Sequence, residues 1–147
     1  MKHLSYILIS ALMLLSACTE SVDNAARQDQ LPKIFPDYIG VTIPENIAPM
    51  NFCVDDNIEK IDVTVRGSNG GEIHVQDDYA DFDIDEWHSI VSQNKGGKLT
   101  FSVCVKKGGQ WLRYNDFTMT VSQYDMPDYA LTYRRIAPGY EVYSKMG

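Results

Sequence analysis

The chain has 147 residues, a net charge of −7 and 44% hydrophobic residues. This length is enough for one domain with a hydrophobic core and is short for two. The negative charge argues against nucleic acid as a partner and against electrostatic binding to anionic lipid headgroups. We therefore expect a single domain, and any attachment to a membrane has to come from lipid.

The first 17 residues have the pattern of a bacterial lipoprotein signal peptide. Lys2 supplies a positive charge, residues 6–15 are apolar except for Ser10, and small residues precede Cys18. The apolar stretch is shorter than the roughly 20 residues that span a bilayer. The Leu-Ser-Ala-Cys motif that ends at Cys18 resembles the lipobox of bacterial lipoproteins, which implies lipidation of Cys18. An ordinary secretory signal with a chance cysteine is the alternative.

Residues 18–33 are predicted to form a flexible tether after the lipidated cysteine. They are polar and contain neither an aromatic residue nor a sustained periodicity. In the lipoproteins that this leader resembles, Asp after the cysteine is a common signal for retention in the inner membrane. Thr19 occupies that position here and favours the outer membrane. The leaflet stays open.

Residues 34–124 are expected to form a mostly β domain. Apolar and polar residues alternate in several short segments, which are separated by turns rich in glycine, proline or asparagine. This spacing is typical of a β-sandwich of the immunoglobulin-like or fibronectin-like kind. The last four segments pair into two expected hairpins. The segments are 38–43, 50–54, 60–66, 73–75, 98–106 and 117–121.

One short helix is expected to connect the two hairpins. Asp83 and Glu86 are spaced like a capping box, and Gly96-Gly97 follows where a helix would end. Ile84, Trp87 and Val91 are expected on one face of the helix. We expect Trp87 to pack in the core. An exposed ligand platform at Trp87 is the weaker alternative.

The acidic run 77–86 is the strongest candidate for metal binding in the sequence. Three of its aspartates match the first three ligand positions of an EF-hand loop, but Glu86 and Ser92 stand where glycine and the bidentate glutamate are required. We interpret the run as a solvated loop with a helix cap. The histidines have no metal-ligand spacing, and no motif for nucleophilic catalysis, nucleotide binding or covalent haem occurs. We therefore expect no metal, no cofactor and no enzyme activity.

Cys53 and Cys104 are the only cysteines besides Cys18. Both are out of phase with the apolar residues of their segments. A cross-strand disulfide is compatible with this pattern if the two strands are neighbours. Two free cysteines within the sheet are the alternative.

The C-terminal segment, residues 125–147, is dense in tyrosine and arginine. Residues 128–141, together with 34–38, 41–49 and 94–101, resemble the N-terminal region of Bacteroidota envelope lipoproteins that carry a TolB-type β-propeller downstream. The resemblance covers about residues 34–145 and implies a β-sandwich module placed ahead of the propeller. Neither the propeller nor the Cys-x-x-Cys-His motif often found in that family occurs here, and a truncated or split reading frame would explain this.

Two kinds of function follow from these patterns. The first is a non-catalytic interaction module of the cell envelope, whose partner is another envelope protein or a downstream propeller. The second is a surface lipoprotein that binds glycans by stacking aromatic side chains on sugar rings. The candidate interaction residues are Tyr129, Tyr133, Arg134, Arg135 and Tyr140, and the candidate stacking residues are Trp111 and Tyr114.

Replacing the lipobox cysteine tests the anchor. We expect Cys18→Ala to move the protein from the membrane to the soluble fraction, because several acyl chains are needed for stable attachment. Fractionation of cells labelled with radioactive palmitate measures this, and Cys53→Ala is the matched control that should stay labelled and membrane-bound. Unlabelled wild-type protein in the soluble fraction would contradict the lipoprotein interpretation.

Overall fold

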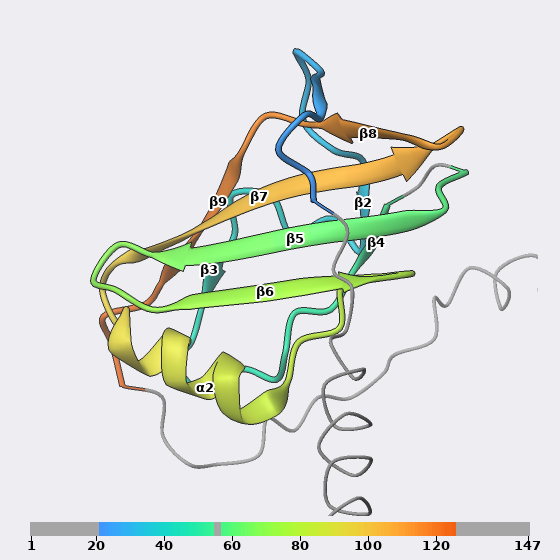
Figure 1. Ribbon diagram of the computed structural model, residues 1–147. Helices are drawn as coiled ribbons and strands as arrows, with labels where there is room; N and C mark the ends of the chain where they lie inside the picture. The colour runs from blue at the N-terminus through green and yellow to red at the C-terminus, as the bar shows by residue number, and fades with distance from the viewer. Residues whose placement is uncertain (1–20, 55–56, 126–147) are drawn as a thin grey trace, which may run out of the picture.

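The computed structural model of the chain describes residues 21–54 and 57–125 (Figure 1). Most of the regular structure is β, and one short helix is present among the described residues. The strands are β1 (Ala26–Arg27), β2 (Ile34–Phe35), β3 (Thr42–Ile43), β4 (Cys53–Val54), β5 (Lys60–Gly67), β6 (Glu72–Asp77), β7 (Lys98–Lys107), β8 (Gln110–Arg113) and β9 (Phe117–Val121), and the helix is α2 (Ile84–Gln93).

Seven of the strands form one sheet around the long strand β7. One edge of β7 pairs with β5, which in turn pairs with β6. The other edge is shared, because β8 pairs with residues 104–107 and β9 with residues 98–101. β1 and β3 add in parallel to β8 and β9. Figure 1 shows this sheet with α2 below β6, while β2 and β4 form a separate two-stranded sheet.

The two hairpins follow from glycines that adopt positive φ. Gly70 and Gly71 turn the chain between β5 and β6, and Gly108 and Gly109 turn it between β7 and β8. The hairpin expected at 60–76 is confirmed. The second hairpin differs from the expectation, because β8 is the direct partner of β7 after the turn and β9 follows only after a break. β8 was missed because its four residues show no clear alternation.

The core lies on one face of the main sheet and is rich in aromatic rings. Phe101 of β7 stacks on Phe117 of β9 at a centroid distance of 4.8 Å. Trp87 of α2 is fully buried, stacks on Phe82 at 5.3 Å, and donates its indole N–H to the carbonyl of Ile47 at 3.2 Å. The prediction that Trp87 belongs to the core is confirmed.

The helix begins where the sequence indicates. The side chain of Asp83 accepts hydrogen bonds from the backbone N–H groups of Asp85 and Glu86, at 2.9 and 3.0 Å. This is the N-cap arrangement that satisfies donors left free in the first turn. The interpretation of Asp83 as a helix cap is therefore confirmed.

The ordered domain begins earlier than the sequence suggests. β1 pairs with β8, the N–H of Gln28 donates to the carbonyl of Arg113 at 2.8 Å, and Pro32 is buried. The prediction of a flexible tether up to residue 33 is therefore wrong for residues 26–32. Backbone groups alone complete the outer edge of β8, so this segment needs no apolar pattern of its own.

The expected mostly β architecture with one connecting helix is confirmed. The main sheet packs through its apolar face against α2, the β2–β4 pair and the segments that connect them, which is consistent with a β-sandwich. Its immunoglobulin-like or fibronectin-like type stays a prediction.

Asn94 links the end of α2 to the β5–β6 turn. Its buried amide donates to the carbonyls of Gly70 and Ile90 at 2.9 and 2.8 Å, and its oxygen accepts from the N–H of Asn69 at 2.7 Å. Gly67 leaves room for this side chain, because an added Cβ would lie 2.0 Å from the Asn94 amide nitrogen.

We expect Asn94→Ala to lower the free energy of unfolding by about 2 kcal/mol, since it leaves buried backbone groups without partners. Urea unfolding measures this. Ser92→Ala, an exposed change in the same helix, should stay within about 0.5 kcal/mol of the wild type. An equally small effect of Asn94→Ala would show that the link does not hold the turn.

Candidate functional site

A row of polar side chains crosses the main sheet on the face opposite the core. Direct cross-strand pairs connect Arg27 of β1 to Arg113 of β8, Arg113 to Cys104 of β7, Cys104 to Asp62 of β5, and Asp62 to Gln76 of β6. Paired residues of a ladder point to the same side of the sheet. We call this row and its neighbours on the same side the polar face.

Asp62 is held firmly in the middle of the polar face. Only 3% of the residue is exposed, and its Oδ2 accepts hydrogen bonds from Nε2 of His74 at 2.8 Å and from the amide of Gln76 at 2.9 Å. A buried carboxylate is costly unless it is bonded in this way. Alternation in the sequence places Asp62 on the polar side of its strand, but it does not indicate that the residue is buried.

Cys104 lies beside Asp62 and is 5% exposed. Burial and then the Asp62 carboxylate raise the pKa of its thiol to about 11, while the Arg113 guanidinium acts in the opposite direction. The thiol is therefore protonated at neutral pH, and the thiolate is the nucleophilic form of cysteine. Although Cys104, His74 and Asp62 share a face, this chemistry does not favour a cysteine nucleophile.

The disulfide considered for Cys53 and Cys104 is not formed. Both cysteines are free, and Cys53 is exposed in β4, where its thiol donates to the carbonyl of Phe35 at 3.4 Å. β4 belongs to the two-stranded sheet and pairs with β2, whereas β7 is central in the main sheet. The condition that the two strands are neighbours is not met.

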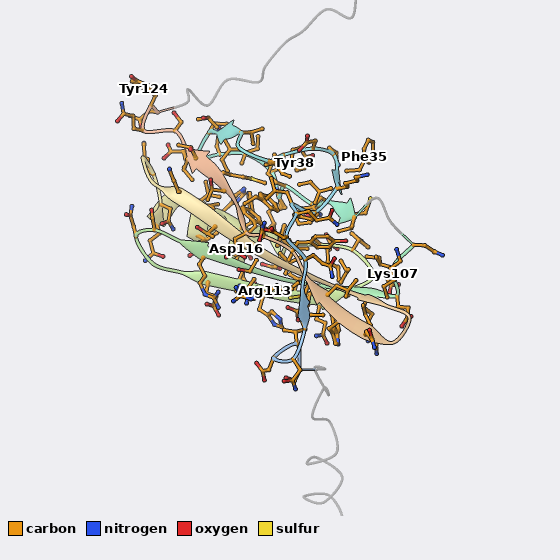
Figure 2. The ribbon with its side chains drawn as sticks, turned by 90° about the horizontal axis from the view of Figure 1, so that it is seen from above. Phe35, Tyr38, Lys107, Arg113, Asp116 and Tyr124 are labelled. Atoms are coloured by element: carbon orange, nitrogen blue, oxygen red, sulfur yellow. The ribbon has the colours of Figure 1, made fainter. Side chains whose placement is uncertain are left out.

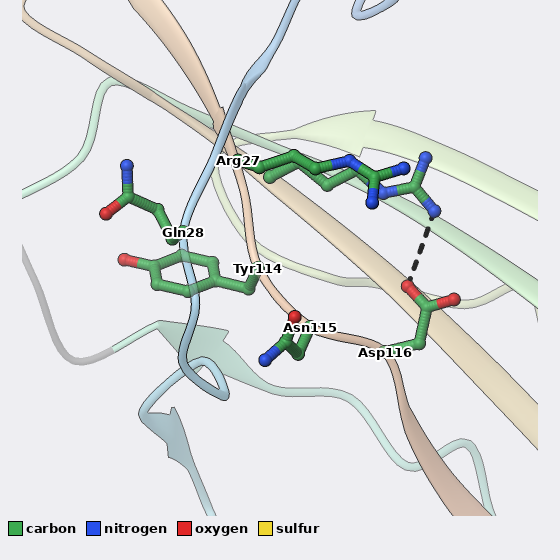
Figure 3. A pocket seen from close by; sticks show the side chains of 6 residues that line it. Arg27, Gln28, Tyr114, Asn115 and Asp116 are labelled. Carbon is green, nitrogen blue, oxygen red and sulfur yellow. Dashed lines mark hydrogen bonds and ion pairs between the residues drawn. The ribbon is translucent and has the colours of Figure 1, made fainter.

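A hollow of about 230 Å³ opens where β1 meets β8 (Figure 3). Nη2 of Arg113 lies 3.4 Å from both Oδ1 of Asp116 and Oγ of Ser102, which are long contacts for an arginine. Figure 2 shows Arg113 and Asp116 beside the blue N-terminal segment. We call this site the arginine hollow, and it is lined by Arg27, Gln28, Arg113, Tyr114, Asn115 and Asp116.

The two candidate stacking residues have different environments. Trp111 is half-buried and lines a second hollow, of about 350 Å³, together with Ala25 and Ala26. Tyr114 is only 8% exposed and packs with the core cluster, so its prediction as a sugar platform is wrong. Tyr114 follows Arg113 and therefore points to the opposite, core side of the sheet, and its N–H still donates to the carbonyl of Val103 at 3.0 Å. In Figure 3 Tyr114 and Gln28 lie on the other side of the strand from Arg27.

The carboxylates of Asp77, Asp81 and Asp83 in the acidic run accept hydrogen bonds from donors of the protein itself. Asp81 accepts from the hydroxyl of Tyr79 at 3.2 Å and from the amide of Asn51, and Asp83 caps α2. These contacts agree with the interpretation of the run as a loop that leads into a helix cap.

Several predicted site residues lie outside the described part of the chain. Within residues 21–54 and 57–125, no helix is long and apolar enough to cross a membrane. The lipidation site and the C-terminal interaction residues stay predictions, because they lie outside the described residues. They are Cys18, Tyr129, Tyr133, Arg134, Arg135 and Tyr140.

Comparison of the chain with protein-family models, with curated proteins and with solved structures finds no match. Its function is therefore inferred from the polar face and from the sequence.

The raised pKa of Cys104 makes stability depend on pH in the alkaline range. Between pH 9.0 and about 11 the unfolded chain releases the thiol proton while the folded chain retains it. The free energy of unfolding should then fall as pH rises, by up to about 1.4 kcal/mol per pH unit from this group. Below that range the contribution is fully present.

Urea unfolding of wild type and Cys104→Ala under reducing conditions measures this slope. The wild type should lose stability more steeply than Cys104→Ala across that range. Parallel curves for wild type and Cys104→Ala would show that Cys104 titrates as freely in the folded chain as in the unfolded one.

Proposed function

We propose that this protein is a lipid-anchored lipoprotein of the outer membrane whose domain, an immunoglobulin-like or fibronectin-like β-sandwich, binds a partner without catalysing a reaction. The observation that carries the proposal is the polar face. Its middle is internally bonded, and its edge at β1 and β8 holds two arginines and a tryptophan beside hollows. Arginine and tryptophan are enriched among residues that dominate binding energies.

The middle of the polar face supports binding rather than chemistry. Asp62 is occupied by His74 and Gln76, and the Cys104 thiol keeps its proton well above neutral pH. Catalytic acids, bases and nucleophiles need pKa values suited to their task and an accessible reacting atom. Buried and satisfied groups of this kind instead give the edge a rigid support.

The position of β1 favours contacts close to the membrane. Ala26 follows Cys18 by eight residues, a length that spans at most about 29 Å when fully extended. If Cys18 carries the lipid, the edge formed by β1 and β8 stays within about this distance of the headgroups. A partner in the same membrane, or one bound to its surface, would be within reach.

The C-terminal segment is the second proposed contact surface. The family that the sequence resembles carries a propeller after this region, so the proposed partner is a propeller domain of that kind or another envelope protein. The proposed contact residues are Tyr129, Tyr133, Arg134, Arg135 and Tyr140.

Glycan binding is the alternative function, and one observation favours it. Trp111 lies on the polar face and is partly exposed beside a hollow at the edge formed by β1 and β8, as a stacking platform requires. Loss of Tyr114 from the proposed platform leaves Trp111 as the aromatic contact at this edge.

Deleting residues 127–147 tests whether the C-terminal segment serves binding or stability. We expect the deletion to lower the free energy of unfolding by less than about 3 kcal/mol, the scale of removing one large buried side chain. Denaturant midpoints measure the difference. Phe101→Ala, which truncates a fully buried ring of β7, is the control that should reach that scale. A larger loss on deletion would make the segment an integral part of the core.

A further inference from the structure

The arginine hollow holds two positively charged side chains on directly paired residues of neighbouring strands. Arg27 and Arg113 are partners in the parallel pairing of β1 with β8. Like charges in such positions repel each other. Arg113 has only the long contacts with Asp116 and Ser102, and Arg27 has no acceptor for its guanidinium among the described residues. A bound anion would remove this repulsion.

The charge of the lining suits a carboxylate. Two arginines and one aspartate leave a surplus of one positive charge, which matches a singly charged anion better than a doubly charged phosphate. The planar guanidinium fork can also donate to both oxygens of a carboxylate. Asp29, which accepts from the amide of Asn115 at 3.3 Å, does not line the hollow.

The neighbouring hollow extends the site along the same two strands. Trp111 precedes Arg113 by two residues in β8, so both side chains lie on the polar face about 7 Å apart along the strand. The small residue Ala25 leaves space beside the indole, and Ser21 and Asn24 add polar groups. Ala26 and Gln110 complete the lining from strand positions that alternate with Arg27 and Trp111. A sugar ring, which presents an apolar face of C–H groups together with hydroxyl groups, suits this combination better than an acidic peptide does.

We propose that the edge formed by β1 and β8 binds an acidic glycan, with a uronic acid carboxylate at Arg27 and Arg113 and an adjoining sugar ring against Trp111. The inference rests on the proposed function of a binding module and specifies the ligand of its glycan alternative. The carboxylate supplies charge-assisted hydrogen bonds, and the ring removes apolar indole surface from water.

Calorimetric titration tests the site. The full chain carrying Cys18→Ala is titrated with oligogalacturonate and oligomannuronate, with the same oligosaccharides after carboxyl reduction, and with oligoglutamate. A uronate oligosaccharide should bind, and Arg27→Gln, Arg113→Gln and Trp111→Ala should each weaken it about tenfold or more. Arg66→Gln is the matched control, because Arg66 lies on the polar face but is paired with Glu72 at 2.6 Å. Circular dichroism confirms that each variant is folded.

Three outcomes would overturn the assignment. They are equal binding of the acidic and the carboxyl-reduced forms, unchanged affinity in the Arg27→Gln/Arg113→Gln double variant, and absence of binding to either uronate. Tighter binding of oligoglutamate would be a fourth such outcome, because it would identify an acidic peptide rather than a glycan as the ligand, while leaving the interaction module in place. Release of new reducing ends from the oligosaccharide would instead contradict the non-catalytic function.

Discussion

The antiparallel pairing of β5 with β7 is the constraint on which both faces of the sheet depend. It runs over eight residue pairs, from Lys60 with Lys106 to Gly67 with Leu99. Side chains alternate between the faces with a period of two, so this register places the apolar residues of both strands in the core. A slip by one residue would turn them outward and carry Asp62 into the core. Several apolar side chains would then be exposed to water and a charge would be buried, and both changes are unfavourable.

The shared edge of β7 explains where the candidate site lies. β8 and β9 pair with different halves of β7, and the chain leaves the ladder between them. Tyr114 points into the core because it alternates with Arg113, and beyond it Asp116 lies within 3.4 Å of Arg113. β1 then completes the outer edge of β8 and adds Arg27. The hollow thus lies where the chain passes from β8 towards β9, and a distant segment supplies one of its two arginines.

The polar face combines a rigid middle with an accessible edge. Asp62 is buried and hydrogen-bonded, and Cys104 is buried and protonated. Arg27 is exposed, and Arg113 makes only long contacts. The chain as a whole carries −7, so its distant field opposes the approach of an anion that the arginines attract locally. At about 0.1 M salt, exposed charges that are more than about 10 Å apart are largely screened, whereas close contacts in a partly buried site are screened much less. Salt therefore weakens the distant repulsion more than the local attraction.

The sequence by itself determined the features that depend on neighbours along the chain. Period-two alternation and paired glycines predicted the β5–β6 hairpin, and the spacing of Asp83, Glu86 and Trp87 predicted the capped helix with its buried indole. The leader and the C-terminal segment are also legible in the sequence, and their roles stay predictions.

Only the tertiary structure decided which distant segments are neighbours. β1 lies in the expected tether but pairs with β8, and this pairing sets Arg27 beside Arg113. Cys53 and Cys104 lie in different sheets, and Tyr114 and Asp62 are buried. Alternation assigns a residue to one side of its strand, but it does not indicate which strand comes next or what covers that side. The pairing of strands far apart in sequence sets both, because it depends on closing many backbone hydrogen bonds and burying the apolar face at once.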